Sequence, residues 1–167
     1  AEDLPSLGRV GEAGGGLLEP GASTALHWGN AKLPQRMRIK APARGDDVGT
    51  MWSGGLSLDD IGNVCVQLWD SDAREEAGGA RQVLASSYVD DATIVLTLTE
   101  LDPQHPIWAI DNESSLPLKL RQKDESRCRI IPPRSRLPIA LDAPTGERVM
   151  FLDPWGDGKK ETGCSLG

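Results

Sequence analysis

The sequence has few of the residues that catalytic and metal sites use most often. It contains only two histidines and three cysteines, and no Cys-x-x-Cys or His-x-x-x-His pair occurs. A zinc site is therefore not expected. A Gly-x-Ser-x-Gly elbow, a phosphate-binding loop and a dinucleotide fingerprint are also absent. We predict neither an enzyme, nor a cofactor, nor a bound metal ion.

The two histidines and the cysteines fit packing or surface roles. His105 lies between two prolines in an expected turn, and His27 precedes a tryptophan in an expected strand. An odd, widely spaced set of cysteines indicates reduced thiols. Cys65 sits in the apolar run Val64–Val66 and is expected to pack as a small hydrophobic residue.

Long apolar runs and an excess of basic residues are missing too. No run approaches the roughly 18 apolar residues that a membrane-spanning helix needs, and the first residues lack the features of a signal peptide. The 18 Lys and Arg against 25 Asp and Glu give a net charge of -7. This charge argues against general binding to nucleic acid. We expect a cytoplasmic protein without a membrane span.

The sequence is rich in turn-forming residues, with 19 glycines and 12 prolines. Between the turns lie short segments of β type. In Thr93–Glu100, for example, Ile94, Leu96 and Leu98 point to one face of a strand. This pattern predicts an all-β fold built from antiparallel β-sandwich units. The expected strands are 36–40, 64–69, 82–88, 93–100, 107–110, 116–122, 127–131 and 148–152.

Two segments of the chain resemble each other. Residues 18–39 align without gaps with residues 131–152, so that Met37 meets Met150 and Ile39 meets Leu152. A repeat of this length corresponds to whole sandwich units stacked in an array. The Gly-rich residues 1–16 are interpreted as a flexible linker or a segment added by cloning.

Basic residues concentrate in one window of an otherwise acidic chain. Residues 119–136 contain seven basic side chains and two acidic ones. Lys119, Arg121 and Lys123 alternate along one expected strand, as do Arg127 and Arg129, so a β-hairpin could present a basic strip. The strip is interpreted either as a solvated face or as a docking surface for an acidic peptide or headgroup.

Four separated motifs resemble the adaptor-binding domain, also called the SHR-binding domain, of the vacuolar protein sorting thirteen family. The members of this family are bridge-like lipid-transfer proteins. The matching motifs cover most of residues 17–155 and occur in the family's order. They are Trp52-Ser53-Gly54-Gly55-Leu56-Ser57-Leu58-Asp59, Ile107-Trp108-Ala109-Ile110-Asp111-Asn112-Glu113-Ser114-Ser115, Leu120-Arg121-Gln122 and Ile131-Pro132-Pro133-Arg134-Ser135.

The resemblance implies an array of β-sandwich repeats, each with a recurrent Asn. In the family, the array binds Pro-x-Pro peptides of membrane adaptors and so recruits the protein to organelle membranes and membrane contact sites. The positions of the motifs divide this chain into the latter part of one repeat, residues 17–102, and the first part of the next, residues 103–167. Neighbouring repeats of the same protein are then expected partners.

The expected peptide-binding residues are Asn112, Ile110, Leu118 and Leu120. A peptide would add to an open strand edge and place its prolines in apolar pockets near the last three residues. Asn112 matches the recurrent Asn. By its residue type alone it would form a plain turn, but if buried its amide would link two loops. We expect Asn112 to hold its strand and the Pro132–Pro133 turn in register.

A second interpretation of a different class stays open. The chain could be a β-sandwich module that binds a carbohydrate or a lipid headgroup, with Trp28, Trp52 or Trp108 as a stacking platform. The chain has five tryptophans against one tyrosine and one phenylalanine. Tryptophans also pack well in the cores of sandwiches, so their number alone does not decide between the two interpretations.

Overall fold

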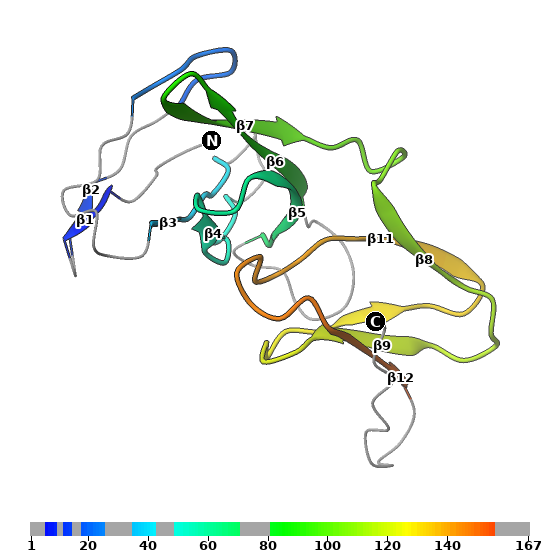
Figure 1. The fold of residues 1–167 in the computed structure, drawn as a ribbon. Coiled ribbons are helices and arrows are strands. Elements are labelled where there is room, and N and C mark those ends of the chain that lie inside the picture. The colour runs from blue at the N-terminus through cyan, green and yellow to red at the C-terminus, as the bar shows by residue number, and fades with distance from the viewer. Residues whose placement is uncertain are drawn as a thin grey trace.

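The computed structural model describes residues 6–9, 12–14, 18–25, 35–42, 49–70 and 81–155 (Figure 1). All regular structure in these ranges is β, and every strand pair in a sheet is antiparallel, which confirms the predicted fold class. The strands are β1 (Ser6–Arg9), β2 (Glu12–Gly14), β3 (Arg36–Met37), β4 (Leu56–Ser57), β5 (Gly62–Leu68), β6 (Arg81–Asp90), β7 (Thr93–Glu100), β8 (Trp108–Asn112), β9 (Leu118–Gln122), β10 (Arg129–Ile131), β11 (Ser135–Ile139) and β12 (Met150–Pro154).

Each expected strand overlaps an observed one, but four observed strands, β1, β2, β4 and β11, have no counterpart in the prediction. β4 is only two residues long, and β11 contains Pro138, which the sequence pattern treats as a strand breaker. Pro138 is tolerated because β11 is the edge of a two-stranded sheet. β1 and β2 lie within the segment 1–16, and the division into a linker and two repeat parts stays a prediction.

The chain forms one large sheet and several small ones. β5, β6 and β7 make a three-stranded sheet, drawn in green in Figure 1. Further along the chain, β10, β9 and β12 form a second sheet, and β8 pairs with β11. Apolar residues of the β8–β11 pair pack against the β9 sheet, so these strands form a small sandwich.

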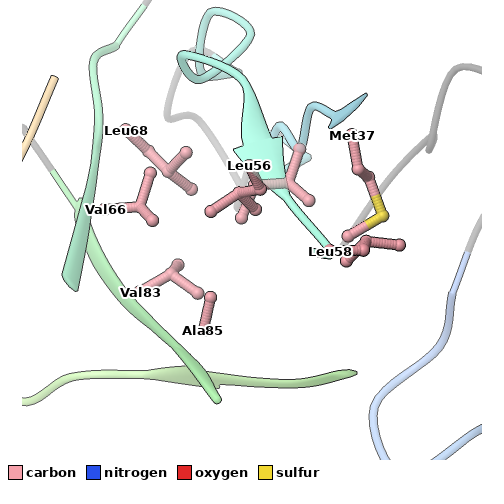
Figure 2. Close-up of a cluster of buried hydrophobic side chains, with 8 residues drawn as sticks. Met37, Leu56, Leu58, Val66, Leu68, Val83 and Ala85 are labelled. Carbon is pink, nitrogen blue, oxygen red and sulfur yellow. The ribbon is translucent and has the colours of Figure 1, made fainter. Parts of the chain in front are cut away.

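The first hydrophobic cluster covers one face of the large sheet. Alternate residues of β5 and β6 point to this face and pack against β3, β4 and the residues next to them (Figure 2). The cluster contains residues from Met37 to Ala85. The two-residue strands β3 and β4 are held in place because Met37 and Leu56 are buried in it. Its buried members are Met37, Ile39, Leu56, Leu58, Val66, Leu68, Val83 and Ala85.

The second cluster lies inside the small sandwich and is continuous with the first. Its buried members are Leu120, Ile131, Leu141 and Met150, and half-buried Val64 packs against both clusters. The residues that the internal similarity aligns take comparable places, since Met37 is buried in the first cluster and Met150 in the second.

Leu141, which follows β11 in the chain, covers part of the outer edge of β5 in the large sheet. Leu141 pairs in parallel with Val66 on the outer side of β5. The backbone N–H of Gln67 donates to the carbonyl of Leu141 (2.9 Å), and the N–H of Leu141 donates to the carbonyl of Cys65 (3.0 Å). Cys65 is buried, and burial raises the pKa of its thiol to about 11, although the charge of Arg129 opposes this shift.

A buried polar network joins the two parts at this edge. Arg129 is only 6% exposed and donates to the Gln67 side-chain oxygen (3.0 Å) and to the carbonyl of Ala140 (2.9 Å). The indole N–H of Trp69 donates to Asp142 (2.8 Å). Burial lowers the pKa of Arg129 and raises the pKa of Asp142, and the attraction between the two charges opposes both shifts. The network makes this junction specific.

The Trp-Ser-Gly-Gly motif also lies at the junction. The N–H of Ser53 donates to the carbonyl of Ile39 (2.8 Å), and the N–H of Ile39 donates to the Ser53 hydroxyl (3.0 Å). Gly54 passes so close to the backbone of Asp142 and Ala143 that a methyl group there would overlap both. The absence of a side chain at Gly54 therefore permits this contact.

The two adjacent glycines give a matched test of that contact. Gly54→Ala should lower the free energy of unfolding by about 1–3 kcal/mol, because the backbone must move apart. Gly55→Ala should change it by less than about 0.5 kcal/mol, since a methyl group there lies 3.6 Å from the nearest atoms of Arg36 and Thr145. Urea unfolding measures both. Equal effects of the two substitutions would contradict the assigned contact.

Candidate functional site

The side chain of Asn112 is the most completely bonded polar group of the small sandwich. It is 2% exposed at the end of β8. Its amide nitrogen donates to the carbonyls of Leu116 (2.8 Å), Ile131 (3.1 Å) and Pro132 (2.9 Å). Its oxygen accepts from the N–H (3.1 Å) and the hydroxyl (2.7 Å) of Ser114.

These bonds join the end of β8 and the loop that follows it to the end of β10, which is about 20 residues away in the sequence. The amide has two N–H donors and one carbonyl acceptor, and all of them are used. Asn112 therefore links the end of β8 to the loop 113–117 and to the end of β10. The geometry is that of a buried cross-link between two loops, not of a plain surface turn.

Gln122 plays a comparable part at the other end of β9, and sequence reasoning missed it. It is fully buried, and its side-chain oxygen accepts from the N–H groups of Asp142 (2.8 Å) and Ala143 (3.0 Å). Its amide nitrogen donates to the carbonyls of Ala143 (2.9 Å) and Glu147 (3.0 Å). The sequence does contain an indication of this role. Gln122 follows Leu118 and Leu120 at a spacing of two residues, which places its side chain on the inner face of β9.

The three apolar residues expected at the site all lie in the small sandwich. Ile110 of β8 and Leu118 of β9 are half-buried and pack in the same cluster from opposite sheets. Leu120 is 1% exposed and belongs to the buried cluster against which Ile110 and Leu118 pack. Together with Asn112, they line the inside of the sandwich, so a ligand could contact Ile110 and Leu118 directly but would reach Leu120 only by opening the core.

The outer edge of β8 is open within the described part of the chain. β8 pairs with β11 only, with Ala109 opposite Pro138. Proline has no N–H, so this pair belongs to the positions whose backbone groups point away from the partner strand. The backbone groups of Ala109 and Asp111 therefore face the open edge. Trp108, at the start of the strand, is 45% exposed.

The predicted basic strip is only partly present. Lys119 and Arg121 lie on the outer face of β9 and stack over Trp155 (5.7 Å) and Phe151 (5.4 Å), measured from the charged group to the ring centroid. The prediction was wrong for Arg129, which is paired opposite Leu120 and so points to the inner face. Arg129 can be buried on the inner face because its guanidinium group donates hydrogen bonds to Gln67 and to the carbonyl of Ala140. The distribution of charges along the sequence does not show that these partners are nearby.

Further candidates from the sequence take separate places. Among the proposed stacking tryptophans, Trp52 is 39% exposed below the ammonium group of Lys40, and Trp28 lies outside the described residues. Across the described ranges, no group of His, Cys, Asp and Glu is arranged to hold a metal ion. Those ranges also contain no helix long and apolar enough to cross a membrane.

Comparison with known proteins gives the same family as the sequence motifs. The family model "Vacuolar-sorting associated protein 13, adaptor binding domain" matches residues 16–148, which include Asn112, the first hydrophobic cluster and the buried members of the second cluster except Met150. The chain belongs to this family. The adaptor binding domain is 29% identical over 144 residues to the "Intermembrane lipid transfer protein vps13B" of Dictyostelium discoideum. This alignment covers 85% of the chain and 2% of the relative.

We expect Asn112→Ala in this adaptor binding domain to lower the free energy of unfolding by about 1–3 kcal/mol, because several buried backbone groups lose their partner. The matched control is Asn63→Ala, at an exposed position of β5, which should change it by less than about 0.5 kcal/mol. Thermal and urea unfolding measure both variants. Unchanged melting of the Asn112 variant together with unchanged peptide binding would contradict the assigned role.

Proposed function

We propose that this domain is a non-catalytic module that binds Pro-x-Pro peptides of membrane adaptor proteins along the open edge of β8. The binding would recruit a lipid-transfer protein, from the cytoplasm, to organelle membranes and membrane contact sites. The family description, an adaptor binding domain, and the printed name of the relative, a lipid transfer protein, support this assignment.

The observation that carries the proposal is the phase of the backbone on β8. Ala109 and Asp111 direct their N–H and C=O groups to the open edge, as Pro138 on the other side indicates. An antiparallel peptide strand would bond to these groups through the residues opposite them. Peptide residues opposite Trp108 and Ile110 would then point their own N–H groups away from β8.

This alternation in the direction of the backbone groups suits a peptide with proline at alternate positions. A proline opposite Trp108 and another opposite Ile110 would lose no hydrogen bond, because the missing N–H groups would face outward. Their side chains would lie on the inner face of β8, where Ile110 and Leu118 are partly accessible and Trp108 offers a ring. The residue between the prolines would bond to Ala109. The Pro-x-Pro spacing thus follows from the two-residue period of the strand.

Asn112 would contribute indirectly in this arrangement. Its amide holds the end of β8 against the end of β10 and so keeps the distance between the two sheets of the sandwich. Peptide prolines would enter at the rim between these sheets. Loss of the amide should therefore weaken binding through the shape of the rim, and not through a lost contact with the peptide.

A titration with two peptides tests the proposal. A Pro-x-Pro peptide should bind about tenfold or more tightly than the same peptide with both prolines replaced by alanine. Acidic residues flanking the motif should add only a small, salt-dependent gain through long-range attraction, because Lys119 and Arg121 lie on the outer face of β9, in the other sheet of the sandwich. The measurement is isothermal titration at low and at physiological salt.

A matched pair of variants locates the site. Ile110→Ala should weaken binding of the Pro-x-Pro peptide by about tenfold, whereas Ile94→Ala on β7 should leave it unchanged. Equal affinity of the proline and alanine peptides would contradict the proposal. If the domain instead binds a carbohydrate or lipid headgroup, both peptides bind equally poorly, and Trp108 fluorescence responds to the sugar or headgroup.

A further inference from the structure

The outer edge of β7 is the longest open strand edge in the described part of the chain. β7 pairs with β6 over eight consecutive positions without a register shift, and no described strand lies on its other side. Directly after the strand, the N–H of Leu101 donates to the carbonyl of Gln82 on β6 (2.8 Å). Because the direction of backbone groups alternates, Ile94, Leu96 and Leu98 direct their N–H and C=O groups to the open edge.

Among the described residues, this edge has none of the features that usually protect a strand edge. Natural sheets block their edges with lysine, proline, a bulge or a covering segment. β7 has no lysine, proline or bulge, and no charged residue from Thr93 to Thr99. The outer edge of β5, by contrast, is covered by Leu141, and the edge strand β11 contains Pro138. The open edge of β7 is therefore suited to pair with another strand.

Apolar side chains next to the edge remain exposed. On the inner face of the hairpin, Val89 is 57% and Ile94 is 45% exposed. On the same face lies a hollow of about 120 Å³ between the large sheet and the loop that carries Pro144 and Arg148. Its walls include Leu96 of β7 and Ile61, which is also exposed. A strand added to β7 would place every second side chain beside Ile94 and Leu96 on this face.

The charges around the edge indicate the chemistry of the partner. Between Gln82 and Pro106 the sequence contains no lysine or arginine, and its acidic residues lie at the two ends of β7. Asp90 and Asp91 precede the strand, while Glu100 and Asp102 stand at its end. Basic residues at both ends of an added strand would therefore face acidic groups.

We propose that the open edge of β7 docks a second polypeptide segment, an extended strand with apolar residues at alternate positions and lysine or arginine at both ends. This site is separate from the proposed Pro-x-Pro site on β8 and depends on neither its residues nor its ligand. It would give the domain two strand-binding edges of different specificity. Partly accessible apolar side chains and proline select the ligand on β8, and charge at the strand ends selects the ligand on β7.

A synthetic peptide tests the specificity of the edge. The probe has alternating valine and threonine in its centre and a pair of lysines at each end. The control peptide has glutamate in place of lysine. At low salt the lysine peptide should bind about tenfold or more tightly than the glutamate peptide, and the difference should shrink as salt rises. Equal binding of the two peptides, or no binding of either, would overturn the proposal.

Two substitutions at one position test the location. Ile94→Pro removes an N–H that faces the open edge, which a strand edge tolerates, whereas Ile94→Val keeps it. The proline variant should bind the lysine peptide about tenfold more weakly than the valine variant. If Ile94→Pro does not fold, Asp91→Asn combined with Glu100→Gln serves instead, and this variant should lose most of the salt dependence. Unchanged binding by these variants would overturn the proposal.

Two controls distinguish peptide docking on β7 from binding at the β8 edge and from self-association of the domain. Binding of the Pro-x-Pro peptide should be the same in Ile94→Pro and in the unmodified domain, so failure at one edge is not failure at the other. Sedimentation should show a monomer. A dimer of the unmodified domain that Ile94→Pro abolishes would mean that a second copy occupies the edge, which would also overturn the proposal.

Discussion

The side-chain amide of Asn112 is the interaction on which the small sandwich depends most. The sheets of this sandwich consist of strands of three to five residues, and two-stranded sheets of that size have little stability of their own. Hydrogen bonds from buried side chains to backbone groups therefore replace a longer ladder. Asn112 joins β8 to β10, and Gln122 joins β9 to the loop 142–147.

Buried hydrogen bonds also hold the large sheet against the small sandwich. The outer edge of β5 is closed by Leu141, and Arg129 satisfies polar groups from both sides of the junction. Gly54 permits close approach of the backbone at the same place. The junction thus uses one sheet edge for internal contact, whereas the edges of β7 and β8 remain open among the described strands. In our account, these open edges are the binding surfaces of the domain.

Much of the fold follows from local pattern, but the site does not. Alternation in Thr93–Glu100 predicted β7 within its observed bounds, because both ends carry turn residues. The pattern missed β11, because Pro138 breaks a strand in most contexts and only its edge position makes it acceptable. It also placed Arg129 on the surface, since the partners that permit its burial, Gln67 and Ala140, come from elsewhere in the fold. The motif around Asn112 indicated the residue, and only the structure gives its five bonds.

The most direct test of strand addition on β8 is amide hydrogen exchange, followed by NMR with and without a Pro-x-Pro peptide. Our account predicts that the peptide slows exchange at Ala109 and Asp111, whose N–H groups face the open edge. Exchange at Ile94, Leu96 and Leu98 on β7 should not change. The account would be contradicted if the peptide slowed exchange on β7 and left exchange at Ala109 and Asp111 unchanged.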